Sequence, residues 1–209
     1  MTAPDAPPPN LFASPSDVSL ARRAAVARQK GCVMWFSGLS GSGKSTIARA
    51  LESALIDAGR LPFVLDGDNL RLGLNRDLGF SENDRAENLR RVAEVARLMA
   101  DASLIVITAF ISPLRASRKA AREIIGPDRF FEVHVSTSLA TCEARDVKGL
   151  YQKARQGLIG DFTGISSPFE PPESPAIEIP TETTGVSEAV RRLTAMLERR
   201  GTFSPGAGA

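Results

Sequence analysis

The sequence predicts an α/β fold in which a mostly parallel central sheet lies between layers of helices. Short apolar runs alternate with stretches of helical periodicity along the chain, which is typical of βαβ units. One of these runs continues through a glycine-rich turn directly into a helix-prone stretch, as expected where a strand leads into its helix. The length of 209 residues fits one domain of this kind with some terminal extension.

Five strands are expected, each from a short apolar run. Such runs are typical of strands that are covered on both faces of a parallel sheet. The expected strands are residues 33–37, 62–66, 104–109 and 131–135, with a short fifth strand near 176–179.

Helices are expected at residues 45–58, 81–101, 113–125, 139–145 and 187–200. Ser81 and Asp84 approximate a capping box at the start of the second helix. Pro113 suits the first position of the third helix, which makes Ser112 the expected N-cap, and Gly201 closes the last helix.

The domain is expected to span residues 21–200, between a disordered proline-rich arm at 1–20 and a loose, flexible tail at 201–209. The arm lacks the basic-then-apolar order of a signal peptide, and no apolar run approaches the roughly 20 residues of a membrane span. A cytoplasmic protein without a membrane partner is therefore expected. A net charge of +2 gives no support for a nucleic-acid partner.

Cys32 and Cys142 have no Cys or His neighbours at metal-binding spacing. We expect both thiols to be buried structural residues rather than ligands or a disulfide.

The glycine-rich turn carries the strongest motif. Residues 38–45 read Gly-Leu-Ser-Gly-Ser-Gly-Lys-Ser, which matches the phosphate-binding P-loop. The glycines let backbone N–H groups point at an anion, and the following helix adds its positive N-terminal end. We expect Lys44 to reach the β- and γ-phosphates of ATP and the Ser45 hydroxyl to bind Mg²⁺. Further ATP contacts are expected from Gly38, Ser40, Gly41, Ser42, Gly43, Thr46 and Arg145.

Two carboxylates, Asp66 and Asp68, follow the second strand. Because the carboxyl ends of parallel strands face the ligand crevice, these side chains should open onto the same space as the P-loop. They can hold Mg²⁺ through water or take a proton from an attacking hydroxyl, whereas an Asp-Gly-Asp turn that satisfies its own backbone is the simpler alternative. The third strand ends without an aspartate, so these carboxylates would replace the usual one there.

The helix at 81–101 places Arg85 and Asn88 on its apolar face. A charged side chain on the buried side of a helix needs a partner. That partner is either an anionic ligand or a structural ion pair.

The basic stretch at about 146–166 is punctuated by Gly157, Gly160 and Gly164. Such a segment suits a lid that closes over phosphates, although a solvated basic helix has the same composition. Phe162 either anchors this loop or stacks on a nucleobase, with Phe80 as the expected second ring.

Several strings together resemble the adenylylsulfate kinase family over roughly residues 20–200. The P-loop alone is shared by very many proteins, whereas the strings at 66–69 and 73–81 are close to diagnostic. The matching strings are Gly38 to Thr46, Asp-Gly-Asp-Asn at 66–69, Gly-Leu-Asn-Arg-Asp-Leu-Gly-Phe-Ser at 73–81, Ala-Phe-Ile-Ser-Pro at 109–113, Lys-Gly-Leu-Tyr at 148–151 and Phe-Thr-Gly-Ile at 162–165.

This resemblance implies a P-loop NTPase-like three-layer fold and transfer of the γ-phosphoryl group of ATP to the ribose 3′-hydroxyl of adenosine 5′-phosphosulfate. It implies the products 3′-phosphoadenylyl sulfate and ADP, a role in sulfate assimilation, a Mg²⁺ cofactor and a homodimer. The length leaves no room for a sulfurylase domain in this chain.

The resemblance also implies residue roles. Asp66 and Asp68 would both sit near the metal and the acceptor hydroxyl, with Ser45 and Asp68 as the metal ligands, and Phe80 and Phe162 would clasp the adenine. The other implied acceptor contacts are Gly67, Asn69, Arg71, Arg85, Asn88, Ile111, Ser112, Lys148, Leu150 and Thr163. Family descriptions name the serine at the position of Ser112 as a phosphoserine intermediate, whereas positioned in-line transfer needs no covalent step.

Two other functions are compatible with a P-loop. A kinase for a sugar acid or shikimate would keep Lys44 but would not need paired aromatic rings. A nucleotide-switched binding protein of the GTPase kind would need an Asn-Lys-x-Asp motif, and no Asn here is followed by Lys.

Overall fold

The structure is a computed structural model that describes residues 10, 12 and 14–203. The flexibility predicted for residues 1–9, 11, 13 and 204–209 concerns parts of the chain outside this description. Among the described residues, no helix combines the length and the apolar character that a membrane span requires.

The described residues form one sheet of five strands in the order β2-β3-β1-β4-β5, and every neighbouring pair is parallel. All five predicted strands are present, with ends that differ by a few residues at most. The strands are β1 (Cys32–Ser37), β2 (Pro62–Asp66), β3 (Ile105–Ala109), β4 (Phe130–His134) and β5 (Ile177–Glu178). The predicted α/β class with a parallel sheet is therefore confirmed.

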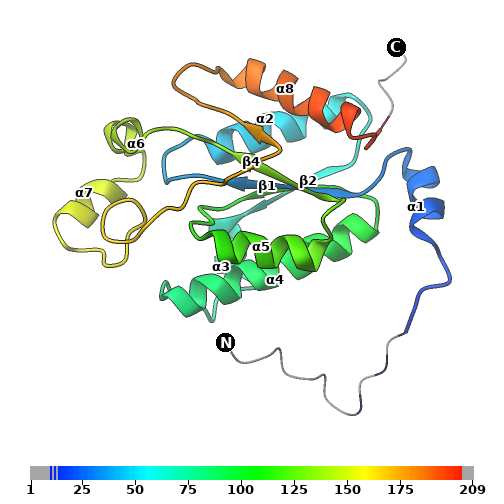
Figure 1. Ribbon diagram of the computed structural model, residues 1–209, viewed down its shortest axis with the longest axis horizontal. Coiled ribbons are helices and arrows are strands. Elements are labelled where there is room, and N and C mark those ends of the chain that lie inside the picture. Colours follow the sequence, from blue (N-terminus) through cyan, green and yellow to red (C-terminus); the bar gives the residue numbers. More distant parts are fainter. Residues whose placement is uncertain (1–9, 11, 13, 204–209) are drawn as a thin grey trace.

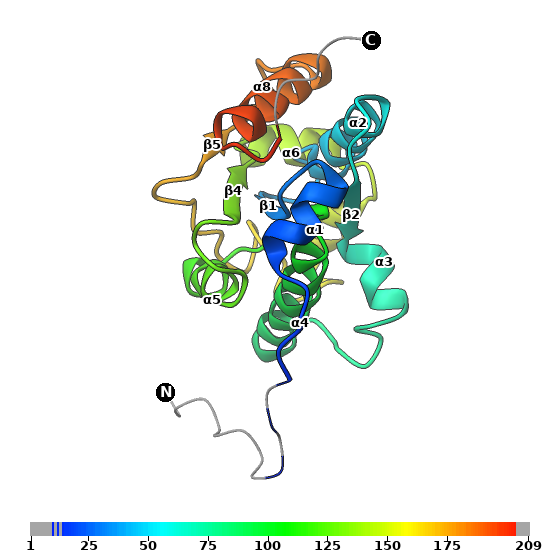
Figure 2. The same cartoon turned by 90° about the vertical axis from the view of Figure 1, so that its right-hand side faces the viewer.

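Helices cover both faces of the sheet. Figures 1 and 2 show α2 and α8 on one face and α4 and α5 on the other, while α1 lies at the opposite end of the sheet from α6 and α7. The helices are α1 (Leu20–Ala27), α2 (Lys44–Asp57), α3 (Gly67–Leu72), α4 (Glu82–Asp101), α5 (Arg115–Ile125), α6 (Leu139–Arg145), α7 (Leu150–Arg155) and α8 (Val186–Arg199).

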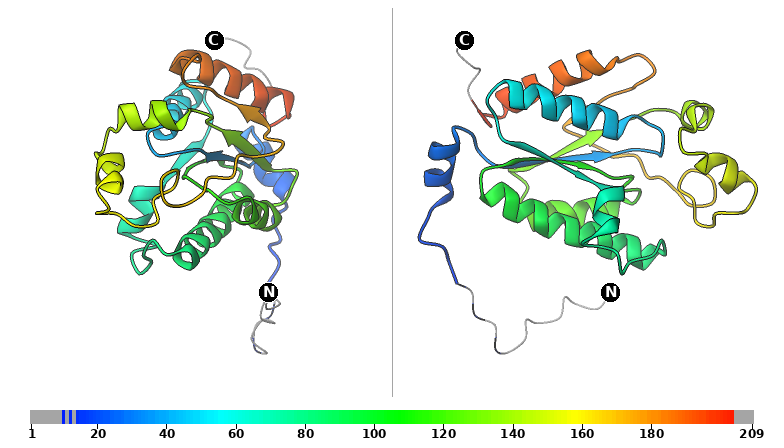
Figure 3. Two further views of the ribbon diagram at one scale, coloured as in Figure 1. Left: turned by 60° about the vertical axis from the view of Figure 1, so that its left-hand side comes forward. Right: turned by 180° about the vertical axis from the view of Figure 1, so that it is seen from behind.

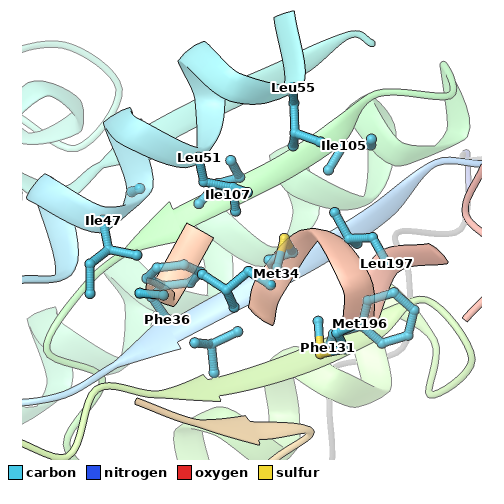
Figure 4. Packing of buried hydrophobic residues seen from close by; sticks show 14 of the residues in the cluster. Met34, Phe36, Ile47, Leu51, Leu55, Ile105, Ile107, Phe131, Met196 and Leu197 are labelled. Atoms are coloured by element: carbon cyan, nitrogen blue, oxygen red, sulfur yellow. The ribbon is translucent and has the colours of Figure 1, made fainter. Parts of the chain in front are cut away.

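Two apolar cores result, one on each face of the sheet. Because side chains alternate along a strand, Met34 and Phe36 of β1 point to one core and Val33 and Trp35 to the other. Figure 4 shows Met34 and Phe36 in the first core, with Leu51 of α2 close by. Covering on both faces explains why the strands read as continuous apolar runs.

Three helices were not predicted. The stretch after β2, for which no helix was predicted, is α3, because the Asp66 side chain accepts a hydrogen bond from the Asp68 N–H at 3.0 Å and so caps the helix. α7 lies inside the predicted lid. α1 begins at the end of the predicted arm and is capped by Ser19, whose Oγ accepts from the Arg22 N–H at 3.2 Å.

The predicted start of the helix after β3 is wrong. α5 begins at Arg115 rather than Pro113, and Ser112 does not cap it. The cap comes instead from Glu170, whose Oε2 accepts a hydrogen bond from the Arg115 N–H at 2.7 Å. A cap from a residue 55 positions away leaves no local signal in the sequence. The capping box at Ser81, in contrast, is present as predicted, with Oγ accepting from the Asp84 N–H at 3.1 Å.

The first residues of the predicted tail are packed rather than loose. Thr202 and Phe203 are buried, and the Lys30 N–H donates to the Thr202 carbonyl at 2.7 Å. The guanidinium of Arg60 lies 4.4 Å from the centre of the Phe203 ring. The predicted domain boundary at residue 200 therefore falls a few residues too early. Cys32 and Cys142 are buried free thiols, as predicted.

Candidate active site

The P-loop joins β1 to α2 at the carboxyl end of the sheet. Its shape requires glycine at Gly38, where φ is +150° and an added Cβ would lie 2.6 Å from the Val135 carbonyl oxygen. Gly43, with φ of +102°, directly precedes α2. The backbone N–H groups at the start of α2 are therefore free of a capping side chain, and exposed Thr46 lies in this first turn.

The loops after β4 and β5 hold the P-loop from outside. The hydroxyl oxygens of Thr137 and Thr181 lie 2.9 and 3.0 Å from the Ser42 carbonyl oxygen. Arg145 donates to the Thr181 hydroxyl at 2.8 Å and to the Gly41 carbonyl at 3.4 Å. Arg145 was predicted at this site, whereas both threonines were missed, since their only signal is that each follows a strand at its carboxyl end.

Lys44 is buried and folded back onto the P-loop. Its Nζ donates to the carbonyl oxygens of Gly38 at 2.9 Å and Leu39 at 2.6 Å. Burial lowers the pKa of Lys44 to about 8, and the nearby charge of Asp66 opposes this shift. The ammonium is thus poorly compensated in the nucleotide-free loop, which favours an anion beside it.

The two carboxylates after β2 point in different directions. Asp66 is 9% exposed, and its Oδ2 accepts a hydrogen bond from the Ser45 hydroxyl at 2.9 Å. The Asp68 side chain, on α3, is 73% exposed and forms an ion pair with Lys148 of the predicted lid. The structure therefore places Asp66, rather than the predicted Asp68, against Ser45, because Asp66 ends the strand whereas Asp68 has turned onto the helix.

Several of the residues predicted to bind the acceptor lie on α3, on α4 and in the segment between them. Arg71 donates to the carbonyl oxygens of Leu78 at 3.2 Å and Gly79 at 2.8 Å. Its guanidinium lies 4.3 Å from the centre of the Phe80 ring, which is 66% exposed. Phe80 is thus an exposed ring with an arginine over one face, and its stacking on a base stays a prediction.

Arg85 and Asn88 do project toward the protein interior from α4. Arg85 donates to the Thr163 hydroxyl at 3.2 Å and also to the Asp161 carbonyl, so its partners here are groups of the lid. Asn88 is buried and accepts a hydrogen bond from the Asn75 side chain at 2.9 Å. Asn75, which sequence analysis did not assign, fixes the orientation of Asn88.

The lid is anchored to the P-loop by an apolar cluster. Phe162 is 8% exposed, and its ring meets the Tyr151 ring edge-on at 5.0 Å between centres. The Tyr151 hydroxyl donates to the Ser40 carbonyl at 3.0 Å. Of the two roles considered for Phe162, this structure shows the anchor, and stacking on a base stays a prediction. Figure 3 shows α6 and α7 together beyond one end of the sheet.

Comparison with known proteins identifies the family. Residues 30–180 match the family model described as Adenylylsulphate kinase. The chain belongs to the adenylylsulfate kinase family. An adenylyl-sulfate kinase of Bacteroides fragilis is 58% identical over 166 residues, which are 79% of this chain and 82% of that protein. One from Vibrio vulnificus is 53% identical over 188 residues, covering 90% and 91% of the two chains.

A solved structure of the same family has the same fold. The Mycobacterium tuberculosis APS kinase, in complex with AMPPNP and APS, is 48% identical and has a TM-score of 0.78. The similarity covers 81% of this chain and 99% of that one. The resemblance inferred from the sequence strings is therefore confirmed.

In this member of the adenylylsulfate kinase family the remaining predicted acceptor residues gather at the same end of the sheet. Gly67 and Asn69 belong to α3, directly after β2. The Ile111 carbonyl accepts a hydrogen bond from the Gly38 N–H at 3.2 Å, which ties the loop after β3 to the P-loop. Leu150 begins α7 and packs against the lid cluster.

Proposed function

We propose that this chain transfers the γ-phosphoryl group of ATP to the ribose 3′-hydroxyl of adenosine 5′-phosphosulfate, through the residues placed above. The assignment of this reaction rests on membership of the adenylylsulfate kinase family. The residue roles rest on the observation that the P-loop, Asp66, Asp68 and the arginines of α3 and α4 all lie at the carboxyl end of one parallel sheet, where such sheets bind ligands.

On the donor side, Lys44 and the N–H groups of the P-loop neutralise the phosphates of ATP. Ser45 and Asp66 fit a Mg²⁺ ion, because both offer hard oxygen atoms only 2.9 Å apart at the edge of the loop. Among the described residues, no group of three or more His, Cys, Asp and Glu side chains is arranged for a metal, so phosphate and water oxygens would complete its shell. The ion would supply positive charge to the phosphate oxygens.

On the acceptor side, Asp68 accepts the hydrogen bond of the 3′-hydroxyl and orients or deprotonates it. Positive charge at the acceptor site comes from Arg71, Arg85 and Lys148. This charge suits the negative phosphosulfate group of the acceptor. Charge-assisted hydrogen bonds of this kind contribute roughly 1.5 to 3 kcal/mol each. When the acceptor binds, its anionic groups would replace the contacts that Arg85 and Lys148 make within the protein in this structure.

Transfer is direct in this proposal, without a phosphoserine. The Ser112 Oγ accepts a hydrogen bond from the Trp35 indole N–H at 2.9 Å, and the residue is 2% exposed. A phosphoryl group on that oxygen would need to be accommodated inside the core.

Ser112→Ala is therefore expected to keep kcat within about tenfold of the wild type, the cost of one lost hydrogen bond. Steady-state kinetics measures this. A loss of several thousandfold, together with ³²P retained on the wild-type chain but not on the variant, would favour the covalent route.

A coupled assay of ADP release tests the proposed function. ATP hydrolysis should be slow without an acceptor and strongly stimulated by adenosine 5′-phosphosulfate, but not by gluconate or shikimate. Stimulation by either of the last two compounds alone would support the sugar-acid or shikimate alternative, which the family match does not favour. Mg²⁺ dependence, a homodimer, a cytoplasmic location and a role in sulfate assimilation belong to the same proposal.

A further inference from the structure

Arg118 of α5 has a buried side chain that no part of the proposed mechanism uses. Only 3% of this side chain is exposed. Its guanidinium donates to the Ser112 carbonyl at 2.7 Å and to the Glu170 carbonyl at 2.6 Å, and its Nε lies 2.7 Å from the Glu132 carboxylate. These three partners come from the loop after β3, from the segment after the lid and from β4.

A buried charge of this kind is costly unless it is fully paired. Replacing both ions by apolar residues is often neutral or stabilising, so stability alone gives little reason to keep the pair. The planar guanidinium has five donors in fixed directions, and it uses them here to join two carbonyl oxygens whose residues are far apart in the sequence. A lysine could retain the charge but not this fixed geometry.

The loop that Arg118 holds has an unusual backbone. Ser112 has φ of +48°, a left-handed conformation that costs a non-glycine residue of the order of 1 to 3 kcal/mol and persists only where its surroundings enforce it. Arg118 holds its carbonyl and Trp35 holds its hydroxyl. The preceding residue, Ile111, is bonded to the P-loop through Gly38.

The segment after the lid is fastened at the same place. The Glu170 carboxylate caps α5 at Arg115, and the Glu170 N–H donates to the Pro113 carbonyl at 2.9 Å. Arg115 also donates to the Pro171 carbonyl at 2.9 Å. The segment after the lid and the loop after β3 are thus one connected unit, with Arg118 bonded to both.

We propose that Arg118 is a positioning residue that sets the affinity for the phosphosulfate acceptor. It bonds to the carbonyls of Ser112 and Glu170 and so holds the loop at 111–112 and the segment after the lid in one relative arrangement. This rests on the proposed function, which assigns Ile111 and Ser112 to the acceptor. The proposed function assigns ATP to other segments, so its binding should be largely insensitive to Arg118.

The test compares Arg118→Lys and Arg118→Met with Arg129→Met. Arg129 is a matched control, because it also pairs with a carboxylate, Asp101 at 2.5 Å, and donates to an α5 carbonyl, that of Ile125 at 3.0 Å. It directly precedes β4, at the amino end of the sheet, away from the crevice. For each protein, kcat, the KM for each substrate and the melting temperature are measured.

We expect both Arg118 variants to raise the KM for adenosine 5′-phosphosulfate by about tenfold or more, with the KM for ATP changed by less than about threefold. Arg129→Met should lower the melting temperature without separating the two KM values. Equal changes in both KM values for Arg118→Lys, or no change in either, would overturn the proposal. If Arg118→Met does not fold, Arg118→Lys decides the outcome, since it keeps the charge beside Glu132.

The experiment distinguishes a failure of the Arg118 proposal from a failure of the proposed function. Wild-type enzyme that is not stimulated by adenosine 5′-phosphosulfate refutes that function before any variant is compared. Active wild type with an Arg118→Lys variant that behaves like Arg129→Met refutes the positioning role alone.

Discussion

Replacing Lys44 with methionine is expected to lower kcat by about 10²- to 10³-fold, the usual cost of removing one group that stabilises charge in the transition state. The Lys44 ammonium lies against the carbonyl oxygens of Gly38 and Leu39 inside the P-loop, where the proposed function places the phosphates of ATP. Steady-state and single-turnover rates of ADP formation measure the loss. Kinetics within about tenfold of the wild type would remove Lys44 from the mechanism.

The variant should remain folded. Because burial lowers the pKa of Lys44 to about 8, below its ordinary 10.5, the charged form opposes folding. This cost is fully present below about pH 8 and fades as the pH rises toward 10.5. Methionine of similar length removes the cost, so the melting temperature at neutral pH should not fall sharply. A collapse of the melting temperature would mean that the kinetic loss reports unfolding instead.

The same pKa gives a further check on the wild-type protein. Because the lowered pKa of about 8 lies near neutrality, part of the Lys44 population is neutral at about pH 8, and the negative phosphates would raise the pKa on binding. Lys44 should therefore contribute an uptake of a fraction of a proton when ATP binds at about pH 8, and this contribution should shrink as the pH falls. Calorimetry in buffers of different ionisation enthalpy measures this number.

Asp68→Asn is expected to lower kcat by about 10²- to 10⁴-fold, with the KM for ATP nearly unchanged. The amide keeps the shape of the side chain but cannot accept the proton of the 3′-hydroxyl. The ion pair with Lys148 joins two exposed side chains, so its loss should cost little stability. Steady-state kinetics with both substrates measures the effect.

Two other carboxylates serve as comparisons. Asp77→Asn removes a neighbouring exposed carboxylate that pairs with Arg91 outside the crevice, and turnover should stay near wild type. Asp66→Asn should lose activity that rising Mg²⁺ partly restores, since Asp66 contacts Ser45, whereas Asp68→Asn should not recover. Recovery of Asp68→Asn by Mg²⁺ would instead make Asp68 a metal ligand, as the sequence resemblance implies.

The elements that local sequence predicts well are those whose signals lie within a few residues. Each of the five strands lies in a short apolar run, and all five were found, although only β1 and β3 are buried along their whole length. The start of α4 was found because Ser81 and Asp84 cap each other locally. The start of α5 was missed because its cap, Glu170, is supplied from beyond the lid.

In the candidate site, too, features with a local sequence signal were predicted and features that depend on distant residues were missed. The P-loop was evident because glycines and Lys44 stand at fixed spacing after a strand. Thr137 and Thr181, which hold the Ser42 carbonyl, were missed, because a lone threonine after a strand has no distinguishing pattern. Asn75 escaped for a similar reason, since its partner Asn88 lies on the next helix.

The fold class, the family and the identity of the chemical groups could all be predicted from the sequence, because periodicity and contiguous motifs specify them. Tertiary structure alone decided that Asp66 rather than Asp68 meets Ser45, that Arg85 holds the lid, and that Arg118 joins Ser112 to Glu170. The physical reason is that each of these contacts spans many residues. Such contacts depend on the order of the strands and the paths of the loops, and propensities that act within a few residues do not encode them.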